Sequence, residues 1–247
     1  MFFNIIFFSM LMIPPVIILA GMKKRVSANT TIFTSIVAVS LVTIGILAIA
    51  RSSGIALGEE FINGAKQIAD VIAKSDELAG QAGLGELSYH ERYKLILTMY
   101  SAINTLLPAT IIVFTAIFTY LLYMFISKMF RKIGKNPEKL TPMKEFGWPP
   151  SLFIGYLMLS LLAMLFELME PFATANLYMN ISIIFEYMLA AQGLGAVFMM
   201  LDKKKIPKVV GAFVGAAGIV IGFVRMVLFA FGMFDFLFSM RGRMARK

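Results

Sequence analysis

The sequence predicts an all-α, polytopic helical bundle, that is, an integral membrane protein. Of the 247 residues, 59% are hydrophobic, and the mean hydropathy is +0.82. Soluble domains average about 45–50% apolar residues. Here the excess gathers in runs of about 18 or more residues, the length that marks transmembrane helices. We therefore expect residues 1–247 to form a single transmembrane domain.

Five of these runs are predicted spans, at residues 2–21, 32–50, 103–127, 150–168 and 178–200. Pro14 and Pro15 should bend the first span or break its backbone ladder. The fourth span begins at Trp148-Pro149-Pro150, since Trp favours the headgroup layer and Pro suits a first helical turn.

A sixth apolar stretch, residues 208–238, is rich in glycine and fits two arrangements. One long helix would place the basic tail outside, although basic segments tend to stay in the cytoplasm. A hairpin of two short segments would return the tail, but each segment would reach only about 22 Å into a core of about 30 Å. The four basic residues of the tail favour this re-entrant hairpin, with its turn near Arg225.

Loop charges predict the topology. Loops 22–30, 128–147 and 202–208 are basic and should be cytoplasmic. Loops 51–101 and 169–177 are neutral to acidic and should be outside, together with the N-terminus of this chain. The positive-inside rule thus explains the net charge of +9, and no nucleic-acid partner is expected. Anionic membrane lipids are natural partners of the basic loops.

Residues 52–100 are predicted to form an extracytoplasmic, amphipathic helical insert. Four apolar residues recur at the spacing of one helix face, namely Phe61, Ala65, Ile68 and Ile72. Most charged residues of this stretch lie elsewhere around the helix. Such a helix should lie on the membrane surface or cover the outer mouth of the bundle. A capping box then starts a second helix near Tyr89, which should continue unbroken into the third span.

Glu186 is the first candidate binding residue, because it lies about eight residues into the fifth span. An ionised group at that depth is costly, by about 2.5–3.5 kcal/mol on insertion scales for Asp and basic residues. Arg225 is the cation in a comparable position. We expect Glu186 to face Arg225 or a cationic ligand. The alternatives are a neutral Glu186 hydrogen-bonded between helices, or an Arg225 that extends to an interface.

Further candidate binding residues flank one outer turn: Glu167, Glu170, Asn176 and Asn180. The two asparagines are four residues apart and so share a helix face. With Glu186 they would form a polar vestibule for a cation or another small polar solute. The alternative is a solvated loop with an asparagine that caps the next helix.

A glycine ladder marks the last apolar stretch, at Gly211, Gly215, Gly218 and Gly222. The spacing places all four on one helix stripe, which allows another backbone to approach closely. Packing within the bundle is the favoured interpretation. A docking surface for a membrane protein partner, or for a second copy of the chain, is the alternative.

No residue pattern predicts an enzyme, a cofactor or a metal site. Cysteine is absent and His90 is the single histidine, which disfavours thiol chemistry and a histidine-based metal centre. The Gln192-Gly193-Leu194-Gly195 sequence lies inside an apolar helix and lacks the strand–turn–helix context of a nucleotide loop.

Several short motifs, in their order and spacing, resemble the YybS-like family of uncharacterised bacterial membrane proteins. They are Leu106-Leu107-Pro108-Ala109, Trp148-Pro149-Pro150, Asn176 through Gln192-Gly193, Lys205-Ile206-Pro207, and Gly232-Met233-Phe234-Asp235 with Arg241 and Arg243. The resemblance covers most of residues 20–243 and implies a multi-pass protein of the bacterial inner (cytoplasmic) membrane. Family members usually begin with further N-terminal spans, so this chain would be a short member or a fragment.

The family is distantly similar to the substrate-binding S components of energy-coupling-factor transporters. This resemblance implies a solute-binding or transport component. The alternative is a non-transport membrane scaffold, in which the glycine ladder and the basic loops recruit other proteins.

Overall fold

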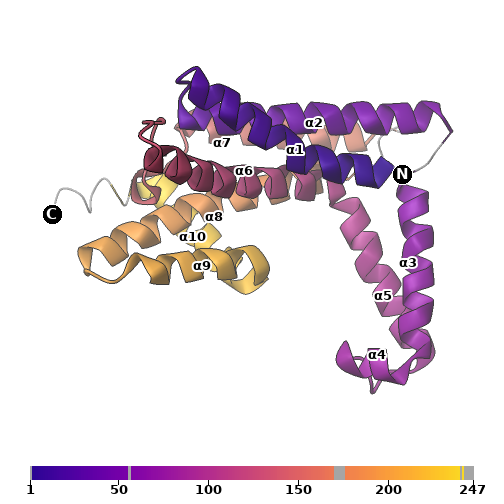
Figure 1. Cartoon of the computed structure of the whole chain (residues 1–247). Helices are drawn as coiled ribbons and strands as arrows, with labels where there is room; N and C mark the ends of the chain where they lie inside the picture. The colour runs from indigo at the N-terminus through magenta and orange to yellow at the C-terminus, as the bar shows by residue number, and fades with distance from the viewer. Residues whose placement is uncertain (1, 55–56, 170–175, 240, 242–247) are drawn as a thin grey trace.

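The computed structural model describes residues 2–54, 57–169, 176–239 and 241. All regular elements within these ranges are helices, which confirms the all-α class (Figure 1). In chain order they are α1 (Phe2–Lys23), α2 (Ala28–Ser52), α3 (Leu57–Lys74), α4 (Asp76–Gln81), α5 (Tyr89–Thr105), α6 (Leu107–Lys132), the 3-10 turn η1 (Met143–Glu145), α7 (Pro150–Glu167), α8 (Leu177–Lys203), α9 (Lys208–Val220) and α10 (Gly222–Phe238).

Four helices of the described chain are long and apolar enough to cross a bilayer, namely α1, α2, α6 and α8. They run along one common direction (Figure 1). The fourth predicted span is formed as α7, whose 18 residues make it shorter than these four. At 1.5 Å per residue it is about 27 Å long, slightly less than a hydrocarbon core of about 30 Å.

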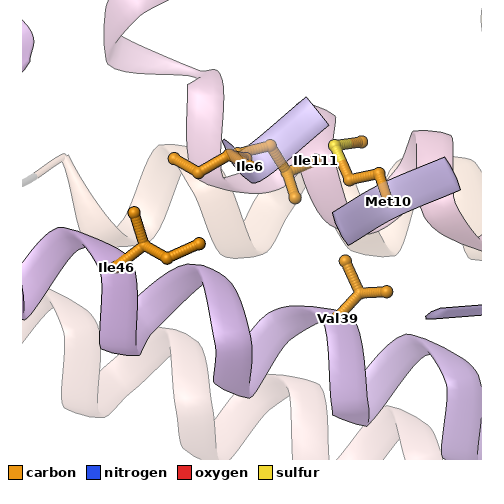
Figure 2. Close-up of a cluster of buried hydrophobic side chains, with 5 residues drawn as sticks. All are labelled: Ile6, Met10, Val39, Ile46 and Ile111. Carbon is orange, nitrogen blue, oxygen red and sulfur yellow. The ribbon is translucent and has the colours of Figure 1, made fainter. Parts of the chain in front are cut away.

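Apolar side chains of α1, α2 and α6 form the core of the first half of the bundle. Ile6, Met10, Val39, Ile46 and Ile111 pack together near one end (Figure 2). Nearer the other end, Ile18 and Met22 pack with Ala28 and Tyr123. Helix α1 remains helical through Pro14 and Pro15, and the bend expected there stays a prediction.

The three basic loops lie at one end of the bundle, which we call the basic end. The Asn29 amide nitrogen lies 3.4 Å from the Thr141 hydroxyl oxygen, which joins the first two loops. Lys144 pairs with Asp202 at 2.8 Å, which joins the second and third. The Asp202 carboxylate also raises the pKa of Lys144 through this hydrogen bond. A shared end is what the predicted topology requires, and its cytoplasmic location stays a prediction.

The predicted insert is an arm made of α3, α4 and α5 (residues 57–105). The capping box is confirmed, since the Ser88 backbone N–H donates to Glu91 at 2.9 Å. The expected continuous helix is wrong, because α5 ends at Thr105 and α6 begins at Leu107. Proline cannot donate a backbone hydrogen bond and its ring clashes with the preceding turn, so Pro108 fits the first turn of a new helix.

The last two helices form a hairpin. They are bent by 113° at Ile221, which has an extended backbone, and not near Arg225 as predicted. The break falls beside Gly222, because glycine has a weak preference for helix. Arg241, beyond α10, donates hydrogen bonds to the backbone oxygens of Lys144 and Phe146. The hairpin therefore enters and leaves at the basic end.

Candidate functional site

An ion pair of Glu186 and Arg225 joins α8 to the first turn of α10, beside the break between α9 and α10. Arg225 Nε donates to Glu186 Oε1 at 2.7 Å, and Arg225 Nη1 donates to the Tyr187 hydroxyl at 2.9 Å. The guanidinium carbon also lies 4.7 Å from the centre of the Tyr187 ring, a cation–π distance. The structure thus gives Glu186 the first of its two expected partners.

The positions of Glu186, Tyr187 and Arg225 along their helices bring these side chains together. Glu186 is nine residues beyond Leu177, the start of α8, and so lies about 14 Å from that end of the helix. Arg225 lies in the first turn of α10, directly after the break. The Tyr187 hydroxyl lies 3.4 Å from the Ile219 backbone oxygen, close to the last turn of α9. We call residues 219–225 the hairpin tip.

The hairpin tip combines polar groups with exposed apolar side chains, since Val220 and Phe223 are 82% and 75% exposed. A helix end leaves backbone N–H or C=O groups without intrahelical partners, and the break creates two such ends. The ion pair adds a full positive and a full negative charge. The Arg225 and Glu186 side chains remain 22% and 32% exposed. Both charged side chains are therefore partly accessible from outside the described chain.

Asn180 does not join this site. Its side-chain oxygen accepts the Ala109 N–H, and its side-chain nitrogen donates to the backbone oxygens of Thr105 and Asn176, each at 2.9 Å. Asn180 is buried and satisfies backbone groups that the break between α5 and α6 leaves without helical partners. We assign Asn180 the structural role of fixing this break.

The other vestibule candidates lie around the start of α8. Glu167 accepts the Tyr178 backbone N–H at 2.9 Å and so caps the first turn of that helix. Asn176 is the N-cap residue, with a left-handed backbone (φ 49°). Glu170 lies outside the described residues. Glu186 pairs with Arg225 while Glu167 bonds to Tyr178, and a vestibule shared by these residues stays a prediction.

The glycine ladder packs mainly against the chain's own helices. A Cβ on Gly211 would lie 2.8 Å from the Phe198 ring, and one on Gly215 would lie 2.9 Å from a Leu194 methyl. A Cβ on Gly218 would lie 2.6 Å from a Leu228 methyl. Packing within the bundle explains these three glycines, whereas a Cβ on Gly222 would approach only Arg225, at 3.9 Å.

The closest helix approach was missed by sequence analysis. It is the crossing of α8 and α10, where a Cβ on Gly193 would overlap the backbone of Leu228. Reciprocally, a Cβ on Gly232 would overlap the backbone of Leu189. The available signal was a repeated pattern, since each glycine follows a leucine by four residues.

A second polar cluster, also missed, lies at the basic end and is here called the clamp (Trp148, Gln192, Asp235 and Arg241). Arg241 Nη2 lies 2.6 Å from Asp235 Oδ2, and Gln192 donates to the same oxygen at 3.0 Å. The Gln192 side-chain oxygen accepts the Trp148 backbone N–H at 3.1 Å. The clamp borders an open cavity of about 480 Å³ and fastens the loop before α7 to α8 and α10.

Comparison with known proteins gives a family but no described ligand. A family model for "Predicted membrane protein (DUF2232)" matches residues 1–236. The chain is 24% identical over 194 residues to "Uncharacterized protein YybS" of Bacillus subtilis (strain 168). This match covers 77% of the chain and 60% of that relative, so the chain spans about three fifths of its length. No solved structure matches.

Proposed function

We propose, from the premise that this chain belongs to the DUF2232 family of predicted membrane proteins, that it binds a small polar solute at the hairpin tip. It would act as a solute-binding or transport component of a bacterial cytoplasmic membrane. The observation that carries the proposal is the Glu186–Arg225 pair, which is part-exposed beside the break between two apolar helices.

Physical principle supports a binding role for this arrangement. Irregular backbone at membrane depth is tolerated where it is covered by protein or lines a cavity, and broken helices commonly build solute sites in transporters. Charged groups within the membrane are costly and usually serve transport or binding. A solute with one anionic and one cationic group suits the tip best, because Arg225 and Glu186 offer complementary charges.

A binding role fits the hairpin tip better than catalysis. Tyr187 is hydrogen-bonded to Arg225, and Glu186 is held in an ion pair, so neither is arranged as a nucleophile with an adjacent base. We therefore propose that the chain is not an enzyme and needs no cofactor.

A membrane scaffold is the second candidate function, favoured by the arm. Helices α3 and α5 extend crosswise beyond the bundle (Figure 1) and present apolar side chains such as Ile68 and Met99. A scaffold would hold stable protein partners, or a second copy of the chain, and no solute.

The test is a native mass spectrum of the protein extracted gently from its own membrane. We expect a bound mass of a few hundred daltons in the wild type. Glu186→Gln should weaken its retention about tenfold or more, because a charge-assisted hydrogen bond contributes about 1.5–3 kcal/mol. Asp202→Asn is the matched control, since it removes a paired carboxylate at the basic end and should retain the ligand.

A melting temperature for each variant separates loss of binding from loss of folding. Wild-type protein without a bound small molecule, but with co-purifying proteins, would favour the scaffold. Equal retention by a folded Glu186→Gln variant would place the solute away from the hairpin tip.

A further inference from the structure

The arm is an antiparallel helix pair closed by small residues. The Phe61 and Tyr100 rings lie 6.0 Å apart near one end, and near the other the Tyr89 hydroxyl donates to Asp70 at 2.8 Å. Between these contacts α3 buries three alanines, Ala65, Ala69 and Ala73, on the side that packs against α5. Helix α5 buries Ile96.

One face of this pair is apolar. Ile68 directly precedes buried Ala69 in α3, and Leu95 directly precedes buried Ile96 in α5. Each is therefore turned by about 100° from its buried neighbour around the helix axis, in the same direction. Equal rotations in an antiparallel pair point to the same side of it. Ile68, Leu95 and the neighbouring Met99 are 43%, 41% and 57% exposed, so this joint face has no cover within the described chain.

The opposite face is mostly polar, with Leu97 of α5 as an apolar exception. Around α3, Lys66 and Asp70 lie about 60° and 100° from Ala69, in the direction opposite to Ile68. Around α5, Ser101 lies on the side of Ile96 opposite to Leu95. The hydrogen bond from Lys74, followed by that from Tyr89, holds the pKa of Asp70 below its usual value, so this carboxylate is charged near neutral pH. The arm therefore has one mostly polar face and one apolar face.

Buried Arg92 makes the far end of the arm rigid. It donates to the backbone oxygens of Leu84 and Gly85 at 3.1 and 2.8 Å, and to Asp76 Oδ1 at 2.7 Å. These bonds hold the glycine-containing turn between α4 and α5. The apolar face is thus a fixed surface on a folded unit.

The bundle fixes where this face lies. Helix α5 is separated from the membrane helix α6 only by Leu106, and Asn180 holds that break. Helix α5 does not lie along the axis of α6. It runs beside α3, across the direction of the spans (Figure 1). The arm therefore extends across the direction of the spans, from the end of the bundle opposite the basic end.

We propose that the arm lies in the lipid headgroup layer, with the joint apolar face of α3 and α5 against the acyl chains. Amphipathic helices in this position bury their apolar side about 5–10 Å into the boundary between headgroups and acyl chains. Continuity with the membrane-spanning helices α2 and α6 makes lipid the occupant, because their ends already place the arm at the bilayer surface. This inference does not depend on solute binding at the hairpin tip.

The absence of cysteine allows a direct test by single spin labels. Ile68→Cys and Leu95→Cys would place labels on the apolar face, and Lys66→Cys and Ser101→Cys on the polar face. The full chain is placed in vesicles of phosphatidylcholine and phosphatidylglycerol. Collision with oxygen, which dissolves in acyl chains, is compared with collision with a water-soluble nickel complex.

We expect the ratio of oxygen to nickel collisions to be several-fold higher at Ile68→Cys and Leu95→Cys than at the two control positions. Equal, water-like ratios at all four positions would overturn the proposal and leave the arm standing in solvent. Protection of the apolar-face labels from both reagents would also overturn it, because a protein surface would then cover them.

Discussion

Gly193→Ala is expected to prevent stable packing of α8 against α10. The added methyl would overlap the Leu228 backbone, which cannot move aside as the end of a flexible side chain can. Overpacking of a close interface costs about 1–3 kcal/mol and occasionally more, and a backbone clash belongs at the upper end of this range. The measurement is the melting temperature and the monodisperse yield of the purified protein.

Gly155→Ala is the matched control for this glycine. Gly155 lies within α7, and an added methyl there would have no atom within 4 Å other than those of its own helix backbone and chain neighbours. Alanine also favours helix over glycine by about 1 kcal/mol, so the control should melt at or above the wild-type temperature. A Gly193→Ala protein as stable as Gly155→Ala would show that the two helices are farther apart than described.

Asp235→Asn is expected to open the clamp. The substitution keeps the shape of the side chain but removes the charge that pairs with Arg241, which is itself largely buried. Breaking a buried ion pair from one side costs about 3–5 kcal/mol, because the remaining charge is left uncompensated. The melting temperature should fall, and trypsin should cleave more rapidly at Lys139 and Lys144 in the released loop.

Asp202→Asn provides the control, since it removes the carboxylate of an exposed pair with Lys144 in the same region. Exposed ion pairs contribute at most about 1 kcal/mol, so its melting temperature should change little. Equal stability losses for the two variants would mean that the clamp is not the main attachment of this loop.

Features set by local pattern could be predicted from the sequence. Long apolar runs located the membrane helices, and the basic tail favoured a hairpin, which fits the break at Ile221 and the contact of Arg241 with the basic end. Glu186 and Arg225 stood out because each is a charge in an apolar stretch that needs a partner. The spacing of the glycines from Gly211 to Gly218 likewise indicated a face for close helix packing.

Features set by distant contacts could not be predicted. The α5–α6 break depends on Asn180, which lies more than 70 residues from the Ala109 N–H that it accepts. The clamp joins Trp148, Gln192 and Arg241, which come from the loop before α7, from α8 and from the segment after α10. Asn180 looked like a ligand-binding residue because sequence shows a polar group in an apolar run but not its backbone partners.

The most direct test of the proposed site is whether α9 and α10 return to the basic end, because the hairpin tip exists only in that arrangement. Single cysteines are introduced at three exposed positions, as Lys204→Cys before α9, Ser239→Cys after α10 and Lys94→Cys on the arm. Each is treated with a membrane-impermeant thiol reagent, in intact cells and in inverted vesicles. The hairpin predicts that Lys204→Cys and Ser239→Cys react from the same side, opposite to Lys94→Cys. Reaction of Ser239→Cys from the side of the arm would show a single crossing and would contradict the proposed binding site.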